Sequence, residues 1–104
     1  MADNRRSSTR HAVSIAAKLA IGESPGADCT ILNLSLGGAL ISAPQRYTMG
    51  QRTHLTFKLD TAEAPIDVGA TVRWADDTSV GIQFDGLRAR DVWALNEYFK
   101  QLAP

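Results

Sequence analysis

Apolar and polar residues alternate along most of the chain. The two longest such runs extend over residues 13–21 and 66–74. A period of two over this length is typical of a β-strand with one buried face. In the second run the alternation predicts that Trp74 shares the apolar face and that Arg73 points the opposite way. Similar patterns predict six strands in all, which cover residues 13–21, 29–34, 39–42, 53–59, 66–74 and 80–84.

Turn-forming residues separate the predicted strands, and a longer period begins after the last of them. The predicted turns and loops cover residues 22–26, 35–38, 44–50, 60–65 and 76–78. After Gly86 the apolar residues recur at steps of three and four, which predicts an amphipathic helix over about residues 87–102. The apolar positions are Val92, Leu95, Phe99 and Leu102. Short strands at regular intervals predict a mainly β fold, an antiparallel barrel or sandwich followed by this C-terminal helix.

The first ten residues differ from the rest of the chain. They are polar, with no apolar residue after Ala2, and three of them are arginines. A segment with so little apolar surface is not expected to fold without a partner. We therefore expect a flexible basic arm at residues 1–10 and one folded domain at residues 11–104.

Composition narrows the functional classes. The 104 residues suffice for a single modest core. The 11 basic and 11 acidic residues balance, so general affinity for DNA or other long nucleic acids is not expected. Cys29 is the only cysteine, which excludes an internal disulfide and favours a small buried thiol. No apolar stretch reaches the ~20 residues of a membrane span, and no signal peptide is visible, so we expect a cytoplasmic protein without membrane insertion.

Three arginines, Arg5, Arg6 and Arg10, are the first candidates for binding chemistry. A guanidinium group can bond two phosphate oxygens at once and can stack on a flat base. A solubilising tail is the alternative interpretation of such a cluster. Against it, the cluster leads directly into the first predicted strand, so Arg10 is expected at the edge of the barrel.

The second candidate is the stretch Asn-Leu-Ser-Leu-Gly-Gly at residues 33–38. Asn33 and Ser35 can read the edge of a base, while Gly37 and Gly38 let backbone approach a ligand closely. Asparagine and serine also form turns by bonding to their own backbone, and this alternative explains either residue alone. It does not explain a polar residue at the end of an apolar strand. Together the two stretches predict a clamp for a small nucleotide.

The two stretches, R-x-x-x-R at residues 6–10 and N-x-S-x-x-G at residues 33–38, resemble the signature of PilZ domains, the bacterial receptors for cyclic di-GMP. Residues 72–74 and 80–84 are similar to the last two strands of that family's barrel. The resemblance covers nearly the whole chain. It implies a six-stranded antiparallel split β-barrel with a C-terminal α-helix, which agrees with the pattern of apolar residues.

The resemblance implies roles for the arginines. Arg6 and Arg10 match the family's motif arginines, which hold the phosphates and guanine faces of the ligand. Arg5 precedes the motif, and in the family an arginine there tends to accompany two stacked ligand molecules. We therefore expect two molecules of cyclic di-GMP per chain, no other cofactor, and an arm that closes over the ligand.

The resemblance also implies that Asn33 and Ser35 contact guanine edges or phosphate, and that Gly37 and Gly38 keep the turn open. Trp74 is a further candidate. Its simplest interpretation is a core or rim aromatic residue, and a base would stack on it if it lay at the mouth of the barrel. Such stacking contributes about 1–3 kcal/mol per base in single-strand binders.

The remaining polar candidates have simpler explanations. Arg73 is expected at the surface, away from the ligand, and His11 either lines the site or ends a strand. His54 lies on the polar side of its strand without a specific role. Asp76 and Asp77 lack a third carboxylate at metal-loop spacing and are expected to be turn residues.

No catalytic motif is present, so the sequence predicts a binding protein and not an enzyme. Two alternatives remain open: a cyclic di-GMP receptor whose arm changes the surface shown to a downstream partner, or an adaptor of the same fold that does not bind nucleotide. A monomer or weak dimer is expected. Trp93 and Tyr98 widen the apolar stripe of the helix, which either packs on the barrel or presents a patch to a partner or another copy.

Overall fold

The computed structural model describes residues 10–22, 26–43, 47–60, 62 and 64–102. Six strands and one helix are formed: β1 (His11–Ala20), β2 (Ala27–Leu34), β3 (Gly38–Ser42), β4 (Arg52–Phe57), β5 (Ile66–Ala75), β6 (Ser79–Phe84) and α1 (Ala89–Leu102). Each predicted strand overlaps one of these, with bounds that differ by no more than two residues. The arm at residues 1–9 and parts of the predicted turns at 22–26, 44–50 and 60–65 lie outside the described residues.

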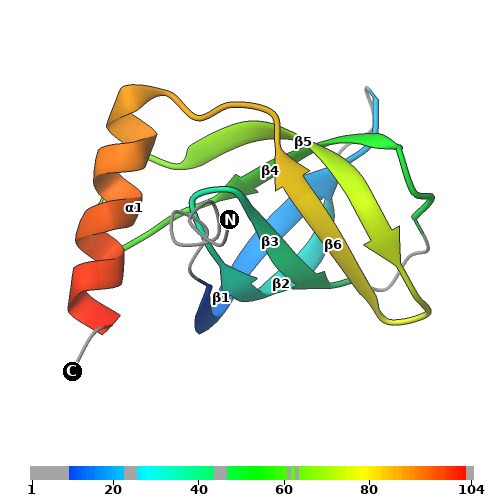
Figure 1. Ribbon diagram of the computed structural model, residues 1–104, viewed down its shortest axis with the longest axis horizontal. Coiled ribbons are helices and arrows are strands. Elements are labelled where there is room, and N and C mark those ends of the chain that lie inside the picture. The colour runs from blue at the N-terminus through cyan, green and yellow to red at the C-terminus, as the bar shows by residue number, and fades with distance from the viewer. Residues whose placement is uncertain (1–9, 23–25, 44–46, 61, 63, 103–104) are drawn as a thin grey trace, which may run out of the picture.

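The six strands close into an antiparallel barrel in the order β1-β2-β3-β6-β5-β4 (Figure 1). Helix α1 comes after β6 and lies beside one end of the barrel. The predicted fold, a mainly β six-stranded antiparallel barrel with a C-terminal helix, is confirmed. A closed barrel leaves each strand with a neighbour on both sides, so the interior is filled by alternate side chains of every strand.

The interior of the barrel is formed by the apolar face of each strand. Burial alternates along β1, where Ile15, Ala17 and Leu19 point inward and Lys18 lies outside. The alternation predicted for the first run is therefore confirmed. Side chains from all six strands are buried in this way. Those that are completely enclosed include Ile31, Ile41, Leu55, Ile66, Val72 and Val80.

The prediction for the end of β5 was wrong, because the strand carries a bulge. Val72 pairs with Ile82 and Trp74 pairs with Gly81, so two steps along β5 face one step along β6. The extra residue is Arg73, and it shifts the alternation by one position. Trp74 is consequently not part of the inner face but is 45% exposed, and Arg73 is exposed beside it. The bulge thus turns two consecutive side chains to the outside of the barrel.

Helix α1 also faces the barrel differently from the prediction. Its buried residues are Asp91, Ala94 and Leu95, whereas Leu102 of the predicted stripe is 41% exposed. Val92 and Phe99 are half-buried, and Phe99 packs against the core. The buried carboxylate of Asp91 is paired with Arg88, whose Nε lies 3.2 Å from Asp91 Oδ2. This ion pair allows a charged residue to occupy the inner side of the first helical turn.

Among the described residues, one buried polar side-chain group has no hydrogen-bond partner, and it leads to a testable prediction. The hydroxyl of Tyr47 is enclosed and makes no hydrogen bond within the described part of the chain, while the residue is only 8% exposed. A buried hydroxyl without a partner is destabilising, so a Tyr47→Phe variant is expected to raise the free energy of unfolding by about 1 kcal/mol. This corresponds to an increase of about 4–8 °C in Tm, measured by thermal denaturation. A lower Tm than that of the wild type would contradict the account of this site.

Candidate functional site

A hollow of about 280 Å³ lies on the outside of the barrel where five segments meet. Arg10 precedes β1, the β2–β3 turn contributes its backbone, and β3, β5 and β6 complete the wall. The lining residues are Arg10, Ser35, Gly37, Gly38, Ala39, Arg73, Trp74, Gly81, Ile82 and Gln83. Five of the eight candidates from the sequence are therefore brought together, although they are up to 64 positions apart in the chain (10 to 74).

Ser35 organises the β2–β3 turn through its side chain. Its Oγ accepts hydrogen bonds from the N–H groups of Gly37 and Gly38, each at 3.1 Å, and donates to the carbonyl of Gly38 at 3.3 Å. The backbone N–H of Ser35 also donates to that carbonyl, at 2.9 Å. A hydroxyl has one donor and two acceptor positions, so its capacity is filled within the turn. Ser35 is 3% exposed, and this geometry fits the turn-forming alternative.

Gly38 holds the turn against β6. A Cβ atom built on it would lie 2.1 Å from the carbonyl oxygen of Ile82, which is backbone and cannot move aside. On the same side, the N–H of Phe84 donates to the carbonyl of Gly37 at 2.8 Å. The absence of a side chain at Gly38 is therefore required for β3 to pair with β6 and for the floor of the hollow to form.

Trp74 forms one wall of the hollow by lying across β6. A Cβ atom on Gly81 would come within 2.4 Å of Trp74 Nε1 and 2.6 Å of its Cε2. The indole thus rests on the bare backbone of Gly81, while 45% of the residue stays exposed. A glycine in a strand often marks such a close approach. The exposed part of the indole can accept a flat ring in the hollow.

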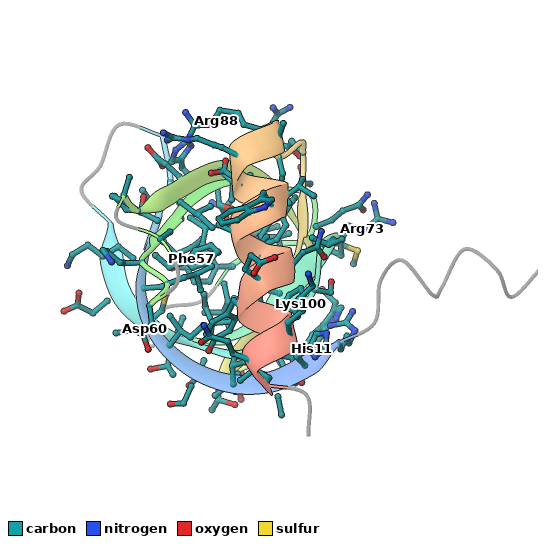
Figure 2. The ribbon with its side chains drawn as sticks, turned by 90° about the vertical axis from the view of Figure 1, so that its left-hand side faces the viewer. His11, Phe57, Asp60, Arg73, Arg88 and Lys100 are labelled. Atoms are coloured by element: carbon teal, nitrogen blue, oxygen red, sulfur yellow. The ribbon has the colours of Figure 1, made fainter. Side chains whose placement is uncertain are left out.

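Two arginines give the hollow its charge. Arg10 enters from the start of β1 and Arg73 from the bulge of β5, and both are exposed. The described lining residues include no carboxylate. Arg73 lies to the right of α1 in Figure 2. The hollow can therefore bind an anionic group between two guanidinium groups.

Part of this wall was not predicted from the sequence. Arg73 was expected at the surface, and it is exposed, but the bulge places it at the same hollow as Trp74. Gln83 and Gly81 of β6 were not recognised as candidates. The glycine was the available signal, since a glycine opposite an aromatic residue in a strand favours a bulge or a close approach.

Asn33 does not line the hollow. It lies in β2, opposite Ala12 of β1 and Leu40 of β3, where the β2–β3 register shifts by one residue. It is half-buried. Arg5 and Arg6 lie outside the described residues. Three of the eight candidates are therefore not placed in the hollow.

The two histidines take part in contacts away from the hollow. The ring of His11 stacks on Phe99 of α1, with a centroid distance of 4.1 Å and an angle of 16° between the rings. His11 is the residue directly after Arg10, so the hollow and the helix are connected through one peptide bond and one ring contact. Nε2 of His54 contacts Oδ1 of Asp67 on the neighbouring strand.

Two other candidates behave as the sequence predicts. Asp76 Oδ1 accepts hydrogen bonds from the N–H groups of Thr78 (3.0 Å) and Ser79 (2.8 Å), and these bonds lower the pKa of the carboxyl group. Asp76 is therefore a turn residue. Cys29 is 8% exposed, and burial raises the pKa of its thiol to about 11. It is the small buried thiol that was expected.

Comparison with known proteins places this architecture in a family. The sequence model of the PilZ domain family matches residues 4–101 of this chain. The chain therefore belongs to the PilZ domain family. No curated protein matches the sequence.

Three solved structures share the fold. The inhibitor of motility MotI/DgrA from Bacillus subtilis superposes with a TM-score of 0.78 and 22% identity, over 94% of this chain and 52% of that one. This chain thus spans about half the length of MotI/DgrA. The PilZ domain of CeSA from a cellulose-synthesizing bacterium has a TM-score of 0.71 and 17% identity, over 92% and 100% of the two chains. PlzA from Borreliella burgdorferi, solved in complex with c-di-GMP, has a TM-score of 0.60 and 19% identity, over 93% and 36%.

No helix among the described residues is long and apolar enough to cross a membrane.

Proposed function

We propose that this chain is a receptor that binds cyclic di-GMP in the hollow formed by Arg10, the β2–β3 turn and Trp74. The observation that supports this most is the convergence of two arginines and an exposed indole on a cavity whose described lining contains no carboxylate. Membership of the PilZ family and the c-di-GMP complex of PlzA support the choice of ligand. The site is a binding site and not a catalytic one.

Each part of the hollow has a role suited to a cyclic dinucleotide. Arg10 and Arg73 bond the phosphate oxygens or stack on guanine, as guanidinium groups do. Trp74 stacks on a guanine ring, an interaction of about 1–3 kcal/mol. The amide of Gln83 can donate to and accept from the guanine edge. Ser35 acts indirectly, because it fixes the backbone of the turn that the ligand approaches.

The hollow alone does not enclose a dinucleotide. Its volume of about 280 Å³ lies at the lower limit of small-molecule sites. We propose that residues 1–9, with Arg5 and Arg6, fold over the ligand and complete the site. Ordering this arm requires about 1–2 kcal/mol per residue for the backbone, which the arginine contacts must offset.

Two ligand molecules per chain are expected, because Arg5 precedes the motif. Calorimetric titration of the wild-type chain with cyclic di-GMP should therefore saturate at two equivalents. An Arg5→Ala variant should saturate at one. If the wild type binds one molecule, the role assigned to Arg5 is wrong while the site itself remains, and if no heat is detected the proposed function is wrong.

We propose that ligand binding at the hollow causes a conformational change that is transmitted to α1 through His11. Movement of Arg10 towards a ligand displaces the adjacent His11, whose ring is stacked on Phe99. Such a displacement changes the position of the helix relative to the barrel, and with it the surface offered to a downstream protein.

An adaptor that does not bind nucleotide is the second candidate function. Two observations favour it: the hydroxyl of Ser35 is fully used within the turn, and Asn33 does not line the hollow. The same titration distinguishes the two functions, since an adaptor would show no binding of cyclic di-GMP.

A further inference from the structure

The outer face of α1 carries an exposed tryptophan beside a groove. Trp93 is 63% exposed, the most exposed aromatic residue among the described ones. The groove has a volume of about 330 Å³ and lies between α1 and the segment that leads into β5. Its lining consists of six apolar residues, Ala62, Ala64, Pro65, Ile66, Trp93 and Ala94, and of the charged residues Arg90 and Asp91. Figure 2 shows α1 in front of the barrel, with Arg88 at one end of the helix. A large exposed apolar side chain next to an apolar groove is typical of an interface.

Two opposite charges flank Trp93 on the same face of the helix. At about 100° per residue, Arg90 and Glu97 lie about 60° and 40° from Trp93 around the helix axis. Arg90 lies about 4.5 Å before Trp93 along the axis, and Glu97 about 6 Å after it. The face thus has a positive group one turn before the tryptophan and a negative group one turn after it.

We infer that this face, which we call the Trp93 face (Arg90, Trp93, Glu97 and the adjacent groove), binds the same face of a second copy of the chain. A two-fold axis near Trp93 makes the two helices antiparallel, so the residues before Trp93 in one copy meet the residues after Trp93 in the other. Arg90 of each copy then lies opposite Glu97 of the other. Trp93 of each copy enters the groove of the other. A two-fold interface requires such a self-complementary surface.

The present contacts of the two charges do not prevent this pairing. Glu97 Oε2 lies 3.2 Å from Lys100 Nζ, and Arg90 Nε lies 3.6 Å from Asp91 Oδ1. The side chains of Arg90 and Lys100 are 60% and 73% exposed, and those of Asp91 and Glu97 are 5% and 36% exposed. The contact of Glu97 with Lys100 is therefore a surface pair that exchanges partners readily. Asp91 keeps Arg88 as its nearer partner. The chain as a whole has no net charge, so two copies do not repel each other at long range.

The association is expected to be weak and to occur in the absence of nucleotide. One helix face and one small groove form a smaller area than the roughly 800 Å² per partner of a standard interface. The hollow proposed for cyclic di-GMP is formed by other residues, so failure of one proposal leaves the other intact.

Sedimentation of the full chain over micromolar to millimolar concentrations tests the inference. The mass of the wild type should rise from the monomer value of 11.2 kDa towards twice that value. A Trp93→Ser variant should remain monomeric throughout. Leu102→Ser is the matched control, because Leu102 is also an exposed apolar residue of α1 but lies about 180° from Trp93 around the axis. It should associate like the wild type. A wild type that stays monomeric, or equal association of the two variants, would overturn the inference.

Charge reversal tests the proposed pairing of Arg90 with Glu97. Arg90→Glu or Glu97→Arg alone places like charges opposite each other twice in the dimer, and each should weaken association by about tenfold. The double variant restores opposite charges and should associate nearly as strongly as the wild type. Circular dichroism identifies any single variant that fails to fold. In that case a Trp74→Phe chain is used, in which Trp93 is the only tryptophan. Its fluorescence emission should shift to shorter wavelength as the protein concentration rises. An unchanged emission would contradict the inference.

Discussion

A Gly38→Ala variant is expected to lose about 3 kcal/mol of the free energy of unfolding, together with the ability to bind cyclic di-GMP. The added Cβ would lie 2.1 Å from the carbonyl oxygen of Ile82 and 3.2 Å from the Cα of Gln83, both of which are backbone. Backbone cannot rotate away as a side chain does, so the turn must separate from β6. The loss lies at the upper end of what overpacking causes in a core. It corresponds to a decrease of about 12 °C or more in Tm.

Gly86→Ala is the matched control for this change. A Cβ atom on Gly86 meets no atom within 4 Å, and its φ is not in the left-handed region. Its Tm should therefore stay within a few degrees of the wild type. If Gly38→Ala melts at the wild-type temperature, the close approach of the turn to β6 is wrong, and the hollow as described is wrong with it.

The second large effect is expected at Arg10. Replacing Arg10 by alanine should lower the affinity for cyclic di-GMP about a hundredfold, because a charge-assisted hydrogen bond contributes about 1.5–3 kcal/mol. The Tm should change little, since Arg10 is exposed and lies outside the strands. Affinity of the wild type should also fall as salt is added, because the phosphate contacts are exposed to solvent. Calorimetry at two salt concentrations measures both effects.

Arg52→Ala provides the control for the loss of a positive charge. Arg52 lies on β4, its side chain is 81% exposed, and it contacts Asp85 without lining the hollow. Its removal changes the net charge of the chain as Arg10→Ala does. Equal loss of affinity in both variants would mean that the effect is one of overall charge and that Arg10 makes no specific contact.

The fold could be predicted because it depends mainly on a local pattern, the alternation of apolar and polar residues within each strand. In a barrel every second side chain faces the interior, so the alternation at Ile15, Ala17 and Leu19 defines a strand and its buried face without further information. The bulge of β5 was not predictable in this way. One extra residue moves Trp74 to the outer face beside Arg73, and the pairing with β6 that reveals the bulge is a contact between residues that are distant in the sequence.

The sequence predicted which segments meet at the hollow better than it predicted the contacts that each side chain makes there. The glycines and Ser35 do form a turn at the hollow, as residues 35–38 indicate. A hydroxyl, however, can bond a ligand or its own turn, and only the distances of 3.1 Å to Gly37 and Gly38 show which bonds Ser35 makes in this structure. The roles of all eight candidate residues in binding remain predictions.

The most direct measurement of the central claim uses Trp74 as its reporter. The chain has two tryptophans, so a Trp93→Phe variant leaves Trp74 as the only indole. Titration with cyclic di-GMP should change the emission of Trp74 in a saturable way, and the added Arg10→Ala substitution should shift the midpoint to about hundredfold higher concentration. Calorimetric binding of cyclic di-GMP with no change in the emission of Trp74 would place the ligand elsewhere and contradict the account.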